Sequence, residues 1–338
     1  MTTRSKSQAL CYSASPSSSD VSTEPSFYKT ALTSLVWFQA MLDEYNALQH
    51  QSTWSLVPLP PSKHSIGCKW VFKIKRNSDG TVARHKARLV AKGFLQQQGV
   101  DFQDTFSPMA KQPTIRILLC FALHHHWPLK QLDISNAFLH SHLDEEVYMD
   151  QPPSFVDPQQ PTLVCKLHKA FYGLKQAPRA WFSAFSSFLL SQGFLQSKCD
   201  SSLFVHKTSS SLTYFLIYVD DILLTGTDQG YIQSLLSHMH QAFSMKELED
   251  ISYFLGISVQ STSDGYFLSQ HKYASELLIK AGMVDCKPCA TPGSVKHAST
   301  VADSLSFSQP FLYRSIIGAL QYLTITRPEI SFAVNQAC

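Results

Sequence analysis

The most informative stretch of the chain reads Tyr214-Phe-Leu-Ile-Tyr-Val-Asp220-Asp221-Ile-Leu-Leu224. It places two adjacent carboxylates inside a strongly apolar segment, where an uncompensated charge is costly and two such charges repel each other. A divalent cation, a buried basic partner or a tight turn that lifts the acids into water would each compensate them. Hairpin turns favour Asn-Gly or Asp-Gly, and the next glycine here is Gly226. This segment alone leaves a metal site and a hairpin tip as equal alternatives.

A third carboxylate occurs in a similar setting, in Gln131-Leu-Asp133-Ile-Ser-Asn-Ala-Phe138-Leu, after the strand-like residues 127–132. Magnesium takes oxygen ligands, and paired sites for phosphoryl transfer hold two ions about 3.5–4 Å apart. One carboxylate from a strand and two from a neighbouring hairpin could bridge such a pair. The alternative is a helix N-cap at Asp133 or Ser135, and Asp133 taken by itself favours that simpler interpretation.

Composition sets the outer limits. The chain has 338 residues, of which 44% are hydrophobic, enough for a large core divided over two or three subdomains. Its net charge of +3 says little about partners. No apolar run reaches about 18 residues, so we expect no transmembrane helix. Residues 1–26 are rich in Ser and Thr and lack an apolar signal core, which predicts a flexible lead-in rather than a secretion signal.

The cysteines give a prediction about the compartment. Eight are scattered along the chain, and without a secretion signal we expect reduced thiols inside the cell. Only Cys286-Lys-Pro-Cys289 has a metal-like spacing. Because a structural zinc needs four ligands and no second pair follows, we interpret that spacing as a coincidence.

Positive charge concentrates between Lys63 and Lys92, where nine Lys and Arg residues accompany a single acid, Asp79. Apolar and charged residues alternate with period two, which predicts a β-hairpin over residues 68–91 with a turn at 77–80. The cations that we expect in rows on its two strands are Lys69, Lys73 and Lys75, then Arg84, Lys86 and Arg88. Two rows of cations suit the phosphates of a nucleic acid or of a nucleoside triphosphate. A solvated, lysine-rich edge is the alternative.

A glycine and a proline bracket the loop Tyr172-Gly-Leu-Lys175-Gln176-Ala-Pro178, which opens a helix predicted over residues 179–191. The helix has an apolar face of Trp and Phe residues, which packing in a core explains fully. The free amides at its start, together with Lys175 and Arg179, suit an anionic ligand.

Five motifs follow one another along the chain, and together they resemble one known family. They are Lys86-Ala-Arg-Leu-Val-Ala-Lys-Gly93, Gln131-Leu-Asp-Ile-Ser-Asn-Ala-Phe-Leu-His140, Tyr172-Gly-Leu-Lys-Gln-Ala-Pro-Arg-Ala-Trp181, Tyr218-Val-Asp-Asp221 and Tyr253-Phe-Leu-Gly-Ile257. From about Glu24 to the C-terminus, the chain resembles the reverse transcriptase of copia-type LTR retrotransposon polyproteins, the kind abundant in plant genomes.

The resemblance implies an α+β fold of the right-hand polymerase type. Fingers and palm would occupy residues 27–270, and the start of a thumb or connection residues 271–338. We expect a palm sheet in which the Asp133 strand pairs with the Asp220 hairpin. The helices that we expect lie near residues 27–54, 179–191, 229–243, 273–281 and 311–324. A complete relative would continue into a ribonuclease H domain, and the few acids beyond residue 270 form no such pattern, so we expect a truncated unit.

The resemblance also implies two-metal nucleotidyl transfer to the 3′-hydroxyl of a primer, with RNA or DNA as template and dNTPs as substrates. Asp133, Asp220 and Asp221 would be the catalytic residues. They would hold two Mg²⁺ ions, for which Mn²⁺ can substitute, and the backbone carbonyl of Ile134 would join the ligands of the nucleotide-bound ion.

Three further residues are implied to contact the nucleotide. Phe138 matches the aromatic ring that reverse transcriptases place under the incoming sugar, where it would exclude a 2′-hydroxyl. Gln176 matches the residue near the dNTP and the template base, and Lys175 precedes it.

The implied contacts to the triphosphate and to the primer lie elsewhere in the chain. Lys86 and Arg88 match the fingertip cations on the triphosphate, although in another hairpin register Lys73 or Arg84 could take their place. The turn that matches the primer grip consists of Phe254, Leu255 and Gly256.

The family works inside the cell as part of a longer polyprotein, within cytoplasmic particles or in the nucleus. We therefore expect the other parts of that polyprotein as partners, and no membrane. Two further function classes stay open: a catalytically silent remnant that holds template–primer through residues 69–92, and a two-metal phosphodiesterase on an unrelated fold. Phe138 and the 175–178 loop argue against the second, because a nuclease has no need to select a deoxyribose.

Overall fold

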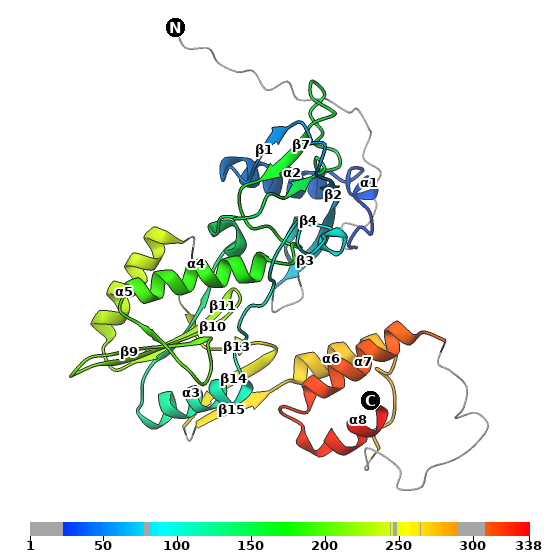
Figure 1. Ribbon diagram of the computed structural model, residues 1–338. Helices are drawn as coiled ribbons and strands as arrows, with labels where there is room; N and C mark the ends of the chain where they lie inside the picture. Colours follow the sequence, from blue (N-terminus) through cyan, green and yellow to red (C-terminus); the bar gives the residue numbers. More distant parts are fainter. Residues whose placement is uncertain (1–22, 78–80, 244, 246–248, 264, 290–307) are drawn as a thin grey trace.

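The computed structural model describes residues 23–77, 81–243, 245, 249–263, 265–289 and 308–338. Figure 1 shows an N-terminal lobe at the top, a central lobe around a six-stranded sheet, and a group of C-terminal helices beside it. Helices are interspersed with sheets whose pairings are antiparallel except for the short pair β2–β6. The expected α+β class is thus confirmed.

The N-terminal lobe contains two helices, a long hairpin and a four-stranded sheet of order β1-β7-β6-β2. Its elements are α1 (Tyr28–Ala31), α2 (Leu35–His50), β1 (Trp54–Val57), β2 (Ser65–Ile66), β3 (Cys68–Arg76), β4 (Val82–Ala91), η1 (Gly93–Leu95), β6 (Tyr148–Met149) and β7 (Val164–Leu167).

The prediction of one helix over residues 27–54 was wrong, because the structure has two helices there, α1 and α2, and β1 begins at Trp54. The Thr33 hydroxyl donates to the carbonyl of Thr30, and Ser34 is extended at φ −111°, so α1 ends before α2 begins. At the other end Ser52 adopts φ +52°, which terminates α2 and turns the chain into β1.

The expected hairpin is confirmed as β3 paired with β4, whereas residues 78–80 of its expected turn lie outside the described residues. The side chains of β3 alternate between buried and exposed. Its buried face packs on α2, where the ring of Trp37 lies 5.4 Å from that of Phe72 and 4.7 Å from that of His85. The hydrophobic alternation in the sequence therefore fixes which face of the hairpin carries the charges.

The expected lead-in over residues 1–26 falls mostly outside the described residues, which begin at residue 23. Within the described part, the Glu24 carboxylate accepts a hydrogen bond from the backbone N–H of Ile74 at 2.9 Å and lies 3.3 Å from the Lys73 ammonium. These contacts attach the start of the described chain to the edge of β3.

The central lobe is a six-stranded sheet of order β12-β5-β11-β10-β9-β8 with helices on both faces. Its elements are α3 (Gln112–His124), β5 (Leu129–Asp133), η2 (Ala137–His140), α4 (Ala177–Ser191), β8 (Leu195–Gln196), β9 (Leu203–Lys207), β10 (Leu212–Tyr218), β11 (Asp221–Gly226), α5 (Gln229–Ala242) and β12 (Glu249–Asp250).

The two faces of this sheet bury separate cores. Leu132 and Ile222 point toward α4 and α5 and join their apolar cluster, whereas Leu129 and Leu223 point toward α3 and the small C-terminal sheet. Successive strand residues alternate between the two cores, which explains why this sequence lacks the polar alternation of a half-exposed sheet.

A three-stranded sheet of order β13-β14-β15 and the C-terminal helices complete the chain (Figure 1). Their elements are β13 (Tyr253–Phe254), β14 (Ile257–Thr262), β15 (Gly265–Ser269), α6 (His271–Ala281), α7 (Pro310–Leu323), η4 (Pro328–Ile330) and α8 (Ser331–Ala337). The expected helices over residues 179–191, 229–243, 273–281 and 311–324 are confirmed within two residues as α4, α5, α6 and α7. None of the helices in the described ranges is long and apolar enough to cross a membrane.

Candidate active site

The strand register brings the three candidate acids together. Asp133, at the end of β5, pairs with Asp221, the first residue of β11, in the antiparallel register. Directly opposed residues on neighbouring strands have Cα atoms about 4.5–5.5 Å apart and side chains on one face. The backbone N–H of Ile134 also donates to the carbonyl of Asp220, at 3.3 Å. The backbone segments that carry these three acids, which are distant in the sequence, therefore come together at one end of the β5–β11 strand pair.

The alternatives for these acids are settled by the backbone. Asp133 lies in a strand, and the 3₁₀ turn that follows begins after Asn136, so neither Asp133 nor Ser135 is a helix N-cap. Val219 and Asp220 form the two-residue turn between β10 and β11, so the acid pair does lie at a hairpin tip. A hairpin tip and a cation site are thus compatible here, because the turn delivers its acids next to Asp133.

The turn itself is strained and supported from below. Val219 adopts φ +56°, a region that hairpins normally give to glycine and that a β-branched residue rarely enters. Its carbonyl accepts a 2.7 Å hydrogen bond from the indole N–H of Trp181, a fully buried residue of α4. Such strain persists only where surrounding contacts enforce it. We conclude that Trp181 helps to hold the acid hairpin in place.

The acids fit a divalent cation in chemistry and in backbone placement. All three are carboxylates, the oxygen ligands that hard cations prefer, and all three are half-exposed rather than sealed in a core. Their side chains do not form a ready-made cage, since within the described ranges no three His, Cys, Asp or Glu residues are grouped closely enough to hold an ion. At least one of the three side chains would therefore need to move for all three to share a cation.

The cations of the β3–β4 hairpin gather on one face, which we call the cationic face. Lys73 pairs with Lys86 and Lys75 pairs with Arg84, so like charges lie directly opposite each other. The members of the cationic face are Lys69, Lys73, Lys75, Arg84, Lys86 and Arg88. Opposed like charges destabilise a hairpin; the Glu24 carboxylate, 3.3 Å from Lys73, offsets part of this cost, and a polyanion bound across the face would offset the rest.

The hairpin meets the central lobe through a close backbone approach. The N–H of Ala91 donates to the carbonyl of Tyr172 at 2.7 Å. Gly173 has φ +92°, and a Cβ atom there would lie 2.2 Å from the carbonyl oxygen of Ala91. A Cβ on Gly93 would lie 2.0 Å from the carbonyl oxygen of Gly173. Gly93 and Gly173, which belong to two of the sequence motifs, are therefore required where β4 runs against the 171–174 loop.

The candidate residue Gln176 is buried, and both ends of its amide are bonded within the protein. Its Nε2 donates to the carbonyl of Asp101 at 2.9 Å, and its Oε1 accepts from Gln96 Nε2 at 3.0 Å. Gln96 in turn accepts from the backbone N–H of Lys175 at 2.8 Å. The predicted contact of Gln176 with the nucleotide stays a prediction, while its visible role is to tie the 93–103 segment to the start of α4.

Lys175 keeps an exposed side chain. Its ammonium donates to the carbonyl of Gln96 at 3.1 Å and lies 5.0 Å from the ring centroid of Phe102. The expected anion site at the start of α4 therefore has two cations nearby: Lys175, which contacts a carbonyl and an aromatic ring, and Arg179, whose Nε lies 3.5 Å from the Asp104 carboxylate.

Phe138, Arg88 and Tyr172 form a cluster beside the acids. The ring of Phe138 meets that of Tyr172 edge-on at 4.9 Å, and the guanidinium carbon of Arg88 lies 4.4 Å from the centroid of the same ring. Burial, together with the negative charges of Asp220 and Asp133, raises the pKa of Tyr172 to about 12, and Arg88 opposes this rise. The phenol therefore stays protonated at neutral pH.

The expected primer-grip turn is a two-residue hairpin between β13 and β14. Leu255 and Gly256 both adopt positive φ, +49° and +77°, the pattern of a type I′ turn. The carbonyl of Leu255 accepts a hydrogen bond from the hydroxyl of Tyr322 in α7. The side chain of Phe254 is only 3% exposed and supports this turn from below, so the predicted contact of this turn with a primer stays a prediction.

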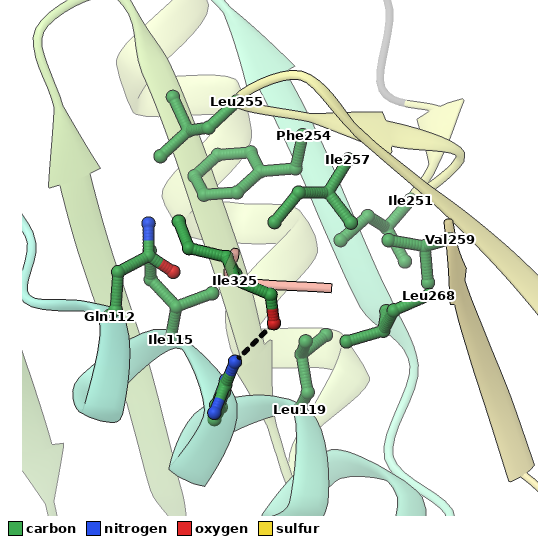
Figure 2. Close-up of a pocket in the computed structure, with 11 residues that line it drawn as sticks. Gln112, Ile115, Leu119, Ile251, Phe254, Leu255, Ile257, Val259, Leu268 and Ile325 are labelled. Carbon is green, nitrogen blue, oxygen red and sulfur yellow. Dashed lines mark hydrogen bonds between the residues drawn. The ribbon is translucent and has the colours of Figure 1, made fainter. Parts of the chain in front are cut away.

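An apolar pocket lies beneath this turn, and Figure 2 shows Phe254, Ile257 and Leu268 directed into it. Ile325, just after α7, lies at its centre, and the carbonyl of Ile325 accepts a 2.7 Å hydrogen bond from the guanidinium of Arg116 in α3. Its free volume of about 20 Å³ has room for about one water molecule. This pocket is a joint between the turn, α3 and the C-terminal helices, and is too small to be a substrate site.

Comparison with known proteins identifies the family. A sequence model described as "Reverse transcriptase (RNA-dependent DNA polymerase)" matches residues 51–295, well over half of the chain. The chain belongs to the reverse transcriptase family. All five motifs that carried the resemblance lie inside the matched range, so that prediction is confirmed.

The relatives place this reverse transcriptase domain among copia-type retrotransposon proteins. It is 49% identical over 89% of its length to the "Retrovirus-related Pol polyprotein from transposon RE2" of Arabidopsis thaliana, and 47% identical over 93% to that from transposon RE1. It is 40% identical over 88% of its length to the corresponding protein of transposon TNT 1-94 of Nicotiana tabacum. The chain spans only 21%, 21% and 23% of these three polyproteins.

Among solved structures, a telomerase of Candida albicans in complex with a fragment of telomeric RNA aligns over 87% of the chain and 61% of its own length. The sequence identity is 9% and the TM-score is 0.37. A likeness at that level carries no argument about the site.

Three residues at the candidate site, Tyr172, Trp181 and Gln96, were not predicted from the sequence. Tyr172 and Trp181 lie within one of the quoted motifs, yet they were interpreted only as part of a loop and of an apolar helix face. Gln96 lies outside all five motifs. The motif that begins at Tyr172 was the available signal for Tyr172 and Trp181, whereas none of the five motifs points to Gln96.

Proposed function

We propose that this domain is an RNA-directed DNA polymerase that adds deoxynucleotides to the 3′-hydroxyl of a primer. The observation that carries the proposal is the register that pairs Asp133 with Asp221 at the tip of the β10–β11 hairpin. A strand and a hairpin separated by about ninety residues of chain supply the acids that two-metal phosphoryl transfer requires.

Asp133, Asp220 and Asp221 would hold two Mg²⁺ ions, or Mn²⁺ in their place, and the carbonyl of Ile134 would add a backbone ligand. When bound, the ions supply activation of the primer hydroxyl and neutralise the charge of the triphosphate and of the leaving pyrophosphate. The protein itself supplies position: the Val219 turn and Trp181 fix the acid hairpin before substrate arrives.

Each of the other candidate residues would contact a different part of the nucleotide or of the primer. Lys86 and Arg88 of the cationic face would hold the triphosphate, and Phe138 would meet the sugar. Lys175 would add positive charge at the start of α4, and Gln176 would support the base-pair side of the site through its bonds to residues 96 and 101. The turn formed by residues 254–256 would contact the primer end.

The domain boundaries follow the same proposal. Residues 27–270 would form fingers and palm, with the N-terminal lobe as fingers and the six-stranded sheet as palm, and residues 271–338 would begin the thumb or connection. An RNA or DNA template with its primer, dNTPs and the remaining parts of a Pol polyprotein would be the partners. The last of these rests on the relatives, of which the chain spans about a fifth.

Primer extension on an RNA template, with dNTPs and Mg²⁺, tests the proposal. We expect extension by the wild type and a loss on the order of 10²–10³-fold or more for Asp220→Asn and for Asp133→Asn, as when a preorganised electrostatic group is removed. Asp228→Asn is the matched control. Asp228 caps α5 through the N–H of Tyr231 and lies outside the site, and Asn is an equally good N-cap.

The catalytically silent binder remains the second candidate, and the spread of the three carboxylate side chains favours it. It predicts that the wild type retains template–primer in a salt-dependent manner while yielding no extended product in Mg²⁺ or Mn²⁺. That outcome would refute the polymerase proposal.

A further inference from the structure

Tyr172 contacts two candidate substrate residues at once. Its ring meets Phe138 edge-on at 4.9 Å and carries the guanidinium of Arg88 over its face at 4.4 Å. Phe138 comes from the segment after β5 and Arg88 from β4, so one side chain joins the central lobe to the cationic face.

The backbone of Tyr172 is fixed relative to β4. Its carbonyl accepts from Ala91 N–H, and the next residue is Gly173, whose approach to Ala91 leaves no space for a Cβ atom. Tyr172 therefore cannot shift along β4 without breaking this contact, and the ring has a defined position beside the acids.

The ring of Tyr172 is a defined contact of the Arg88 guanidinium. The Nε of Arg88 is buried and has no hydrogen-bond partner. The charges that act on this region are the acids Glu44 of α2, Asp133 and Asp220, together with the neighbouring cation Lys86. A planar guanidinium stacks on an aromatic face and keeps its edge for bidentate contact with phosphate oxygens.

We propose that Tyr172 is a specificity-determining positioning residue, which sets Phe138 and Arg88 at a fixed separation so that the sugar and the triphosphate of one nucleotide are recognised together. The inference rests on the proposed polymerase function and assigns to Tyr172 a role that neither the motifs nor the register require. The 2′-hydroxyl of a ribonucleotide would clash with Phe138, and the ribonucleotide could avoid this clash only by moving its phosphates away from Arg88. Because Tyr172 contacts both residues, it would keep Arg88 from following the phosphates, and the shifted nucleotide would bind more weakly.

A residue that merely fills the core would behave differently. Removing it would lower the free energy of unfolding, and kcat would fall with the fraction of folded protein, while the preference for deoxynucleotides would stay the same. A positioning residue would alter KM and the sugar preference in molecules that remain folded.

The experiment is single-nucleotide extension with a dNTP and with the matching rNTP. It uses the wild type, Tyr172→Phe, Tyr172→Leu and the control Tyr45→Leu. Tyr45 packs in the core of the N-terminal lobe, where its ring lies 4.5 Å from that of Phe155 and 6.1 Å from that of Trp54. Tyr172→Met, which keeps most of the volume without a planar ring, replaces the leucine variant if that variant does not fold.

We expect Tyr172→Phe to behave as wild type, because both ring contacts remain. Tyr172→Leu should raise KM for the dNTP about tenfold and lower the dNTP-to-rNTP ratio of kcat/KM about tenfold, the scale of losing one cation–π and one aromatic contact. Tyr45→Leu should change neither quantity. An active wild type with an unaltered ratio in Tyr172→Leu and Tyr172→Met would overturn the inference and leave the polymerase intact. A wild type that incorporates neither nucleotide would refute the proposed function and this inference with it.

Discussion

Two hairpins of this domain carry charges of opposite sign, and they differ in where along the hairpin these charges lie. The β3–β4 hairpin carries its cations along one face, exposed at Arg84 and half-buried at Lys86 and Arg88, with like charges opposed across the strands. The β10–β11 hairpin is apolar along its length and carries its acids only at the tip, where Val219 is strained and Trp181 holds the turn. The first can bind an extended polyanion at many points, whereas the second can act only at one point. Its position must therefore be defined more strictly.

The largest expected effect comes from the contact between β4 of the first hairpin and the 171–174 loop. Gly173→Ala adds a Cβ atom 2.2 Å from the Ala91 carbonyl at a residue with φ +92°. We expect the free energy of unfolding to fall by about 2–5 kcal/mol, the sum of a left-handed conformation and an overpacked contact. Urea unfolding measures this change.

Gly99→Ala separates these two causes. Gly99 has φ +81° but nothing within 4 Å of a Cβ atom, so strain alone should cost about 1–2 kcal/mol. If Gly173→Ala and Gly99→Ala lower the free energy of unfolding equally, the close approach of β4 to the 171–174 loop is not the contact that joins the lobes.

The two indole hydrogen bonds sharpen the comparison between the hairpins. Trp181 donates to Val219 in the acid hairpin, and Trp70 of β3 donates to the carbonyl of Pro153 at 3.0 Å. Trp181→Phe and Trp70→Phe each remove one such bond, and we expect each to lower stability by about 1–2 kcal/mol. Only Trp181→Phe should lower kcat, by roughly ten- to a hundredfold, because it releases the acids from their position.

Stability curves and single-turnover rates on the same preparations measure both effects. A kcat that falls equally in the two variants would show that stability, rather than the position of the acid tip, governs the rate.

The smallest expected effect concerns the cationic face. Lys75→Gln removes one of two opposed like charges, so the free energy of unfolding should rise by about 0.2–0.5 kcal/mol. The slope of log affinity for template–primer against log salt should become shallower by about 0.7–0.9, as for one lost phosphate contact. Lys207→Gln, an exposed lysine on β9 of the other lobe, should leave the slope unchanged. An unchanged slope in Lys75→Gln would remove this lysine from the nucleic-acid interface.

The same contrast explains how much could be predicted from the sequence. The β3–β4 hairpin was predicted with its buried and charged faces, because a period-two pattern fixes a register once one face is buried. Periodicity within one strand does not tell which distant strand it pairs with. The position of Asp133 beside Asp221 was therefore expected only from the resemblance of the motifs to a known family. The contacts of Tyr172 and the Trp181 bond depend on tertiary packing. The break between α1 and α2 depends on Ser34, whose local preference a helical pattern conceals.

The central claim is that Asp133 and the Asp220–Asp221 pair share cations. Titration of Mn²⁺, followed by the loss of its free electron paramagnetic resonance signal, tests it without requiring turnover. We predict that the wild type binds Mn²⁺ and that Asp133→Asn and Asp220→Asn each weaken the affinity by at least about tenfold, because each removes a carboxylate ligand from a different segment. Asp228→Asn should bind as the wild type does. Unchanged Mn²⁺ affinity in Asp133→Asn would contradict the account, since the strand and the hairpin would then hold no ion in common.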